Sequence, residues 1–327
     1  MPAASRPARG AAPAGLGAVV IGRNEGSRLK RSLASLQGQV AQLIYVDSGS
    51  TDGSAEVARQ MGADVVELDM ARPFTAARAR NAGLAVLRKD LELVQFADGD
   101  CEVDPGWLPA ATRFLAAHPG VAAVCGRRRE RFPEASVYNR LCDAEWDTPV
   151  GEATACGGDV LMRVKAVRGA GGYRDSLIAG EEPELCLRLR RAGWRIWRLE
   201  AEMTLHDAAM RRFGQWWRRS RRAGHAFAEG AALHSKASER HWAAETRRAL
   251  LWGAVLPGAV LLAALAVGPW ALAGLLIYPA QVLRLHRRVG AERALFLVLG
   301  KFAEAVGVAE YHWNRLRGAT RGLLEYK

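Results

Sequence analysis

Residues 17–54 read GAVVIGRNEGSRLKRSLASLQGQVAQLIYVDSGSTDGS, and their pattern decides the fold. An apolar run, GAVVIG, comes before a stretch of helical periodicity over residues 27–37, and a second apolar run, QLIYVD, follows it. Short apolar runs separated by amphipathic helices indicate parallel strands joined by crossover helices. The stretch therefore predicts the first two strands of an α/β sheet that is covered on both faces.

The same alternation continues along the chain. Helical segments over residues 54–61 and 75–87 alternate with the apolar runs ADVVEL and LELVQFAD, and a helix ending near Ala117 precedes a strand VAAVCG. We expect a sheet domain over residues 17–210. The lead over residues 1–16 is rich in alanine, proline and arginine and lacks the apolar core of a secretory signal, so we expect it to be disordered.

Size and charge restrict the class of protein. The 327 residues carry a formal net charge of +12 and are 50% hydrophobic, enough to bury a substantial core, which excludes a wholly disordered chain. The basic balance suits an anionic partner: nucleic acid, a phosphorylated small molecule or the anionic leaflet of a membrane. The five cysteines are widely spaced and include no C-x-x-C pair, so they predict thiols in a reducing compartment rather than disulfides or a zinc site.

Polar loops follow three of the predicted strands: RNEG, VDSGSTDGS and DGDCE. Ligands of open α/β sheets bind at the carboxyl ends of the strands, so these loops are expected to meet in one crevice. In the third loop, Gly99 allows a turn that lets Asp98 and Asp100 reach one hard divalent cation. A calcium EF-hand loop is excluded because Val103 and Pro109 stand at its sixth and twelfth positions. The pattern predicts Mg²⁺ or Mn²⁺ held together with substrate phosphates, with a polar strand-end turn as the alternative.

Two common nucleotide-binding patterns are absent from the sequence. The first strand runs into GRNEGSRL, which has no G-x-G-x-x-G, and no P-loop motif occurs. Ordered motifs instead resemble the family 2 glycosyltransferases with the GT-A fold, over roughly residues 17–213. The motifs are VVIGRNEGSRLKRSLASL, IYVDSGSTDGS, AARARNAGL, FADGDCEVDPGWL, CGGDVLMR, GYRDSLIAGEEPELCLRLRRAGW and LHD. The resemblance implies an α/β fold with a Rossmann-like mixed sheet that binds a nucleotide-diphosphate sugar.

The resemblance also implies positions that bind the donor. Asp47 matches the residue that reads the nucleotide base, and Arg23 and Glu25 match a first loop that touches the same base. Arg80, in ARNAGL, matches a position near the diphosphate, where its planar fork suits phosphate oxygens.

A DxD pair and a later histidine resemble the metal site of the family. Asp98 matches a position near the ribose and the metal, Asp100 matches a metal ligand, and His206 in LHD can complete the metal shell. The cofactor implied is Mn²⁺ or Mg²⁺. A lone histidine after a strand is equally compatible with an ordinary polar residue. Glu102 and Asp104 are expected to shape the loop or to face the acceptor.

The catalytic base of the family lies in a Gly-Glu-Asp-x-Glu/Asp-Leu motif. Here the stretch reads GEEPEL, so Glu182 stands where the aspartate base belongs, with Glu181 as the alternative. Such a base takes the proton of the acceptor hydroxyl as its oxygen attacks the anomeric carbon. Glutamates at this point also favour the positive end of a helix, whether or not they act in catalysis.

An aromatic and basic segment begins near Arg211. RRFGQWWRRSRRAGHAF places aromatic side chains near one helical face among arginines. Over residues 211–248 this predicts interfacial helices in a lipid headgroup layer, or equally a helix whose aromatics pack on the catalytic domain. A nucleic-acid-binding helix is a further alternative, although no nucleic-acid partner is expected. Gln215 and Arg218 match part of the Q-x-x-R-W signature of processive family members and are candidates to contact the acceptor or diphosphate, but Arg219 replaces the tryptophan.

Residues 249–282 contain no charged side chain. At about 20 residues per span, this run allows a hairpin of two helices turning near VGPW, or one long span with an interfacial extension. A buried soluble hairpin is the remaining alternative. Arginines flank the run on both sides, which places both flanks in the cytosol and favours the hairpin. Residues 249–327 are therefore predicted to form a membrane hairpin and an amphipathic helix.

These features together predict an inverting, metal-dependent glycosyltransferase on the cytoplasmic face of a bacterial-type inner membrane. Its donor would be a nucleotide-diphosphate sugar. Its acceptor would be a hydroxyl of a lipid or lipid-linked glycan in envelope polysaccharide or glycolipid synthesis. The alternatives are a nucleotidyltransferase with a similar α/β core and a catalytically inactive membrane scaffold, the latter suggested by glutamate in place of aspartate at position 182.

Overall fold

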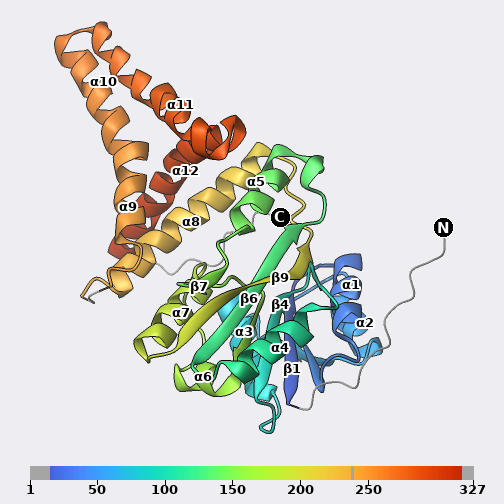
Figure 1. Ribbon diagram of the computed structural model, residues 1–327. Helices are drawn as coiled ribbons and strands as arrows, with labels where there is room; N and C mark the ends of the chain where they lie inside the picture. Colours follow the sequence, from blue (N-terminus) through green and yellow to red (C-terminus); the bar gives the residue numbers. More distant parts are fainter. Residues whose placement is uncertain (1–14, 237–238, 319–327) are drawn as a thin grey trace, which may run out of the picture. The chain divides into compact units, whose positions relative to one another are not determined.

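The computed structural model describes residues 15–236 and 239–318 of the chain (Figure 1). These residues group into two units. The first unit holds residues up to 132, 143–176 and 181–208, and the second holds 133–142, 177–180 and those from 209 onward. The expected disordered lead lies outside the described residues, apart from its last two, and Leu16 already begins the first strand.

Four parallel strands form one half of the sheet in the first unit, in the order β3-β2-β1-β4. This confirms the parallel α/β pattern predicted for the start of the chain. The strands are β1 (Leu16–Gly22), β2 (Gln42–Asp47), β3 (Asp64–Glu67) and β4 (Leu93–Asp98). The helices between them are α1 (Ser27–Leu36), α2 (Ser54–Gln60) and α3 (Ala76–Val86).

The other half of the sheet is mixed. β8 pairs antiparallel with both β4 and β6, β9 runs parallel to β6, and β5 and β7 pair antiparallel with β9. The strands are β5 (Cys101–Val103), β6 (Val121–Glu130), β7 (Gly151–Ala153), β8 (Val160–Arg163) and β9 (Arg195–His206). The helices are α4 (Trp107–Ala117), α6 (Val164–Gly169) and α7 (Glu181–Arg191). The pairing of β5 with the end of β9 brings the DGDCE turn beside the LHD stretch.

Alternate side chains of β1 enter two separate cores, one on each face of the sheet. Ala18 and Val20 pack with α1 and α4, whereas Val19 and Ile21 pack with α3 and α7. Burial of each large aliphatic side chain stabilises the fold by roughly 1.5–3 kcal/mol. A Cβ at Gly83 would lie 2.3 Å from Val19 Cγ1, so glycine is required where α3 approaches β1. This close approach fixes the position of the preceding helical turn, which carries the arginine of ARNAGL.

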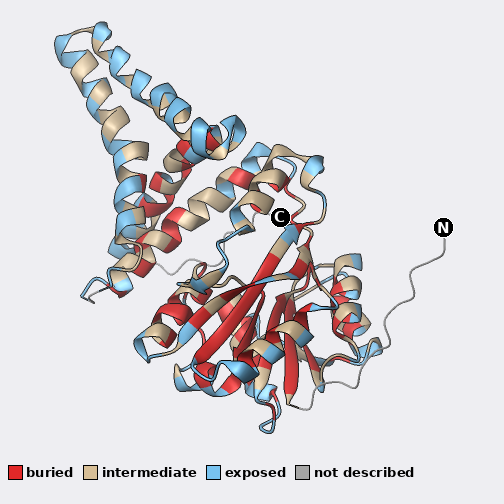
Figure 2. Cartoon of the chain, viewed as in Figure 1, coloured by how far each residue is buried: buried red, intermediate tan, exposed pale blue. Residues whose placement is uncertain are grey.

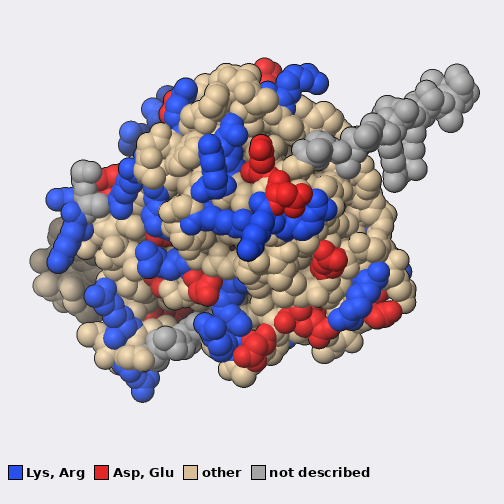
Figure 3. All heavy atoms as spheres, turned by 90° about the horizontal axis from the view of Figure 1, so that it is seen from below, with Lys and Arg blue, Asp and Glu red and all other residues tan. Residues whose placement is uncertain are grey.

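Some exposed charges of the first unit form ion pairs of opposite sign. Exposed ion pairs such as Arg88–Asp90, at 2.6 Å, and Arg195–Glu152, at 3.0 Å, place the two signs together. Figure 3 shows lysine and arginine interspersed with aspartate and glutamate on one face of the molecule.

The second unit is helical. It contains η1 (Pro133–Ala135), α8 (Phe213–Leu233), α9 (Ala243–Leu250), η2 (Leu251–Val255), α10 (Leu256–Val267), η3 (Pro269–Leu276), α11 (Ile277–Val289) and α12 (Ala291–Leu316), while α5 (Val137–Trp146) belongs partly to each unit. Residues 243–267 form one continuous helix that contains a strongly apolar 18-residue stretch, and no residue of that stretch is buried. The helix ends at Gly268, whose φ is 115°, within the VGPW stretch where the sequence predicts a turn. α10 and α11 bury no residue of their own, as Figure 2 shows.

Glycines allow α8 and α12 to pack closely. A Cβ at Gly224 would lie 2.0 Å from the backbone oxygen of Glu304, and a Cβ at Gly307 would lie 1.9 Å from that of Arg221. The aromatic face of α8 is divided between packing and exposure. Trp216 is only 5% exposed, with its ring 4.9 Å from that of Phe296 in α12, whereas Phe213 is 49% exposed. Part of the aromatic stripe expected in a lipid layer therefore packs within the second unit.

Candidate active site

The turn between β4 and β5 carries the two DxD aspartates. The Gly99 amide donates to the backbone oxygen of Ile21 at 2.8 Å, and a Cβ at Gly99 would lie 3.2 Å from the same oxygen. Glycine therefore lets the turn lie against β1. The side chain of Asp98 is 31% exposed, whereas Asp100 is buried. The two carboxylates thus lie at the carboxyl end of β4, where the sequence predicts them.

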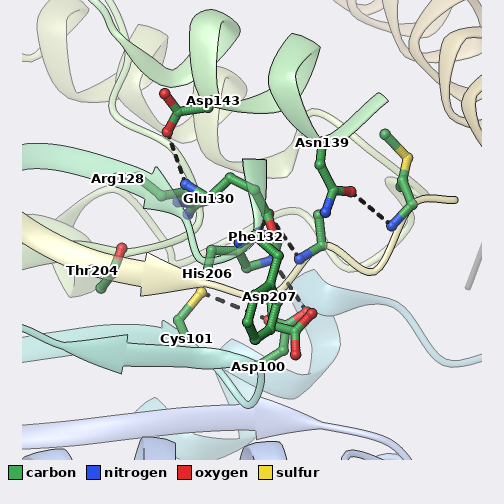
Figure 4. Close-up of polar contacts among 12 residues, drawn as sticks. Asp100, Cys101, Arg128, Glu130, Phe132, Asn139, Asp143, Thr204, His206 and Asp207 are labelled. Carbon is green, nitrogen blue, oxygen red and sulfur yellow. Dashed lines mark hydrogen bonds and ion pairs between the residues drawn. The ribbon is translucent and has the colours of Figure 1, made fainter. Parts of the chain in front are cut away.

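Asp100 faces His206 across the β5–β9 pair. His206 Nε2 lies 3.1 Å from Asp100 Oδ2, and Glu130 Oε2 lies 4.0 Å from Nδ1 on the other side of the ring. Figure 4 shows these side chains converging, with Cys101 and Asp207 nearby. Burial, and after it the positive charge of Arg128, lowers the pKa of His206 to about 4. The imidazole is therefore neutral at neutral pH, and its nitrogen lone pair can bind a metal.

This donor set fits Mn²⁺ or Mg²⁺. Carboxylate oxygen is the ligand that both ions prefer, and imidazole nitrogen is compatible with divalent transition metals such as Mn²⁺. Asp98 lies two residues from Asp100 on the same turn and can add a further oxygen. The structure brings Asp100 and His206 together, whereas the Asp98 side chain pairs with Arg80 at 2.7 Å. A shared metal site of all three residues stays a prediction.

Arg80 joins the DxD turn to the GEEPEL helix. Its Nη2 donates to Asp98 Oδ1 at 2.7 Å and its Nη1 donates to Glu181 Oε1 at 2.8 Å, while the side chain is 2% exposed. Burial alone would lower the pKa of Arg80, but the charges of Asp98 and Glu181 outweigh it and raise the pKa, so the guanidinium stays charged. The sequence places Arg80 near the diphosphate. In the structure, both terminal nitrogens of its guanidinium group donate to carboxylates.

Glu182 is held by a loop and by its own helix. Its Oε1 accepts the Cys156 amide at 2.7 Å and the Cys186 thiol at 2.7 Å, and only 3% of the residue is exposed. Burial raises the pKa of Glu182, although hydrogen bonds from Cys186 and from the amides of Cys156 and Gly157 oppose the change. Glu182 and Glu181 therefore point to different partners, although both begin α7.

Asp159 is a buried residue with several polar partners, and the sequence pattern does not mark it as part of the site. Its Oδ1 accepts the Asp98 amide at 3.0 Å, and its Oδ2 accepts the Thr204 hydroxyl at 2.9 Å and lies 3.0 Å from Arg128. It is 0% exposed. The one indication of its importance in the sequence is that it is the aspartate of the motif CGGDVLMR, just before β8. Asp159 fixes the backbone on which Asp98 is carried.

The polar loops RNEG and VDSGSTDGS are hydrogen-bonded to each other. Asn24 Oδ1 accepts the Thr51 amide at 2.7 Å, and the Gly26 amide donates to Asp52 at 3.0 Å. Asp47 accepts hydrogen bonds from the amides of Gly49 and Ser50 and from the Tyr45 hydroxyl.

The two other residues predicted to read the base lie in the first loop. Arg23 lies over the ring of Phe74 at 5.0 Å, and Glu25 pairs with Arg28 at 2.9 Å. The roles of Arg23, Glu25 and Asp47 toward a nucleotide base stay predictions.

Other predicted residues have structural partners. Asp104 accepts the Gly106 amide at 2.8 Å, and Glu102 pairs with Arg131, so both shape their loops. Gln215 accepts the Arg212 amide at 3.0 Å and so caps α8. Gln215 and Arg218 belong to the second unit, and their predicted contact with the acceptor or diphosphate stays a prediction.

The sequence of this chain matches a known family and several known proteins. Residues 18–161 match the model of the family described as glycosyl transferase family 2. The chain is 29% identical over 182 residues to the succinoglycan biosynthesis protein ExoA of Rhizobium meliloti, covering 52% of this chain and 54% of that protein. It is 30% identical over 215 residues to the pre-mycofactocin glycosyltransferase of Mycobacterium tuberculosis, covering 62% and 44%. The chain thus spans about half the length of the curated relatives it matches.

Solved structures share the fold. A mannosyltransferase from Pyrobaculum calidifontis, in complex with GDP-Man and Mn²⁺, superposes with a TM-score of 0.66 at 21% identity, covering 92% of this chain and 88% of that one. Residues 1–349 of TarS from S. aureus superpose with a TM-score of 0.51 at 14% identity, covering 93% and 91%. The fold of this chain is therefore one found in solved structures, among them that of a mannosyltransferase.

Proposed function

This chain belongs to glycosyl transferase family 2 and has the GT-A fold, and from that premise we propose that it transfers a sugar, with inversion, from a nucleotide-diphosphate donor to an acceptor hydroxyl. The complex of the Pyrobaculum mannosyltransferase with GDP-Man and Mn²⁺ supports a nucleotide-sugar donor and a divalent metal. The family match favours this reaction over nucleotidyl transfer.

The observation that carries the proposal is the buried Arg80 bridge. One guanidinium contacts Asp98 at 2.7 Å and Glu181 at 2.8 Å, so the DxD turn and the start of α7 meet at one place. In a transfer reaction the donor diphosphate and the acceptor must lie on either side of the same anomeric carbon. The Arg80 bridge fixes the distance between the DxD turn and the start of α7. This would hold the donor and the acceptor hydroxyl at a separation from which the hydroxyl can attack.

Asp100 and His206, with Asp98, would hold Mn²⁺ or Mg²⁺. When bound, such an ion supplies electrostatic stabilisation of the diphosphate as negative charge develops on it. The neutral imidazole supports this role, because a protonated ring could not donate a lone pair. Asp159 supports it further by fixing the Asp98 amide through a hydrogen bond of 3.0 Å.

Glu182 would act as the general base. Its carboxylate takes the proton of the acceptor hydroxyl while the oxygen bonds to the anomeric carbon and the bond from that carbon to the diphosphate oxygen breaks. The nucleoside diphosphate leaves with the electron pair, and a single displacement inverts the configuration. The raised pKa supports this assignment, because a base with a pKa closer to the working pH accepts a proton more effectively. Glu181, committed to Arg80, would act as a positioning residue.

We propose membrane attachment through residues 243–267. The uncharged part of this helix, residues 249–267, is about 29 Å long at about 1.5 Å per residue, which matches a hydrocarbon layer of about 30 Å. Arg247 and Arg248 near its start, and the basic end of α11, support a cytosolic position for both flanks. An enzyme held there would meet a lipid or lipid-linked acceptor on the cytoplasmic face of the inner membrane.

A donor panel tests the function. The purified chain in detergent is incubated with GDP-, UDP- and dTDP-sugars, with Mn²⁺ or with a chelator. We expect one donor to bind and to hydrolyse slowly only when Mn²⁺ or Mg²⁺ is present, and to be consumed faster once a suitable lipid-linked acceptor is added. Absence of metal-dependent binding and hydrolysis across the whole panel would refute the proposal.

A further inference from the structure

Three cysteines that lie far apart in the sequence meet around the proposed base. Cys125 comes from β6, Cys156 from the loop between β7 and β8, and Cys186 from α7. The Cys156 thiol lies close enough to Cys125 and Cys186 for both to raise its pKa, after the larger effect of burial. The Cys186 thiol in turn lies 2.7 Å from Glu182 Oε1. The sequence argued against a zinc site because the cysteines are widely spaced, but the fold removes that spacing.

The ligand atoms of this cluster are close enough to share one ion. One oxygen of Glu182 and the sulfurs of Cys156 and Cys186 all lie within 4.8 Å of one another. Ligands of a tetrahedral zinc ion bind at about 2.0–2.3 Å, which puts neighbouring ligand atoms within about 4 Å of each other. Small side-chain movements would therefore bring the three groups to bonding distance, with Cys125 next to them as a fourth candidate.

The chemistry of the cluster differs from that of the Asp100 site. Two thiols and one carboxylate make a soft donor set, which prefers Zn²⁺, Cd²⁺ or Cu⁺, whereas Asp98, Asp100 and His206 suit Mn²⁺ or Mg²⁺. We propose that Cys156, Cys186 and Glu182 form a binding site for a thiophilic cation, of which Zn²⁺ is the physiological example.

Occupation of this site would block transfer, an effect that rests on the proposed function. A carboxylate that binds a cation cannot take the acceptor proton, so the cation and the acceptor would compete for Glu182. Cys156 is the least buried of the three proposed ligands. Cys186 is buried, and although the neighbouring Cys156 lowers the pKa of its thiol, burial and Glu182 raise it to about 12. The thiols are thus protonated without a cation, and binding releases protons.

A Cd²⁺ titration tests the site, because cadmium thiolates absorb in the ultraviolet by ligand-to-metal charge transfer. The reduced full chain, saturated with Mn²⁺, should develop this band up to one equivalent of Cd²⁺ and lose transfer activity in parallel. The Cys156→Ser/Cys186→Ser double variant keeps hydroxyl donors toward Glu182. It should bind Cd²⁺ more than about 100-fold more weakly, because the loss of even an outer-shell partner costs about 10–100-fold.

The control variant is Cys142→Ser, which removes a buried thiol of α5 outside the cluster. It should give the band of the unchanged protein, and thermal melting without Cd²⁺ checks that each variant is folded. Activity is read in each variant as the ratio with and without Cd²⁺. An equal band in the double variant would place the thiolate ligands elsewhere, for example at Cys101 beside Asp100, and would overturn the proposal.

The two proposals fail in different ways. A Cd²⁺ band that depends on Cys156 and Cys186, in a protein that transfers no sugar, would refute the proposed function and leave the cation site standing. Transfer with Mn²⁺ but no Cd²⁺ band in the folded protein would refute the cation site and leave the function standing.

Discussion

Asp100 and Glu182 are both buried carboxylates of the sheet unit, but their surroundings differ. Asp100 faces the neutral imidazole of His206 at 3.1 Å, and two residues before it Asp98 is tied to a permanently charged arginine. Glu182 instead faces a backbone amide and a thiol, both at 2.7 Å. These different partners support the two roles proposed above, metal binding for Asp100 and proton transfer for Glu182.

The largest effect is expected at Glu182. Glu182→Gln should lower kcat by about 100- to 10,000-fold, because an amide cannot take the acceptor proton. Donor affinity should change little, since the amide oxygen can still accept the Cys156 hydrogen bond. Steady-state kinetics and donor titration measure the two quantities separately.

Glu181→Gln is the matched control for that change. It weakens the Arg80 bridge but leaves the proposed base, so its loss of kcat should be smaller. If Glu181→Gln is inactive and Glu182→Gln retains full activity, the base is Glu181 and the roles of the two glutamates are exchanged.

The next effect is expected at Asp100. Asp100→Asn should abolish the Mn²⁺ dependence of donor binding and lower transfer by about 100- to 1,000-fold, the usual loss when one stabilising group of a transition state is removed. Donor binding titrated against Mn²⁺ measures this. Asp104→Asn should keep the normal Mn²⁺ response, because Asp104 caps a loop by accepting the Gly106 amide. A normal Mn²⁺ response in Asp100→Asn would remove Asp100 from the metal site.

A smaller effect is expected at Asp159. Asp159→Asn keeps an acceptor for the Asp98 amide but removes the charge that faces Arg128 at 3.0 Å. The Mn²⁺ concentration needed for half-maximal activity should rise by about 10- to 100-fold, as when an outer-shell partner of a metal ligand is changed. At saturating Mn²⁺, kcat should recover. A fall in kcat with no change in the Mn²⁺ requirement would show that Asp159 acts on the fold alone.

The smallest effect is expected in the pH dependence of transfer, which reports directly on the protonation of Glu182. Burial raises the pKa of Glu182 above the ordinary 4.5, so the carboxylate becomes protonated, and inactive as a base, at a higher pH than an exposed glutamate. Transfer at saturating donor and Mn²⁺ should therefore fall about tenfold per pH unit below that raised pKa. The raised pKa of Glu182 affects the free energy of unfolding in the opposite direction to its effect on activity. The stabilisation is present at low pH, where the carboxyl group is protonated, and it is lost as the pH rises through the folded-state pKa. A kcat that stays constant down to pH 4.5 would contradict the assignment.

Much of the donor side could be predicted from local pattern. The parallel strands from β1 to β4 follow from apolar runs and helical periodicity, and the turn at Gly99 follows from two carboxylates around a glycine. The second half of the sheet could not be predicted in the same way. β8 and β5 are short and pair antiparallel, so their partners depend on contacts that are distant in the sequence.

Side-chain partners were the harder part to predict. The contacts of Asp159 and the meeting of Cys156 with Cys186 arise from how a loop, a strand and a helix pack, and sequence spacing carries no sign of them. The partners of Arg80 could not be predicted from the sequence either. Its motif placed it near the donor, but its two carboxylate partners became visible only in the fold.

The pairing of β5 with β9 also sets the order in which the site can form during synthesis. Asp100 leaves the ribosome early, but its partner His206 is the last residue of the last strand in the sheet. The metal pair is a contact of long sequence separation, a kind that forms slowly because a large loop must close first. A nascent chain that still lacks β9 therefore has the DxD turn without its histidine, and it should become able to bind Mn²⁺ tightly only when the whole sheet unit has been made.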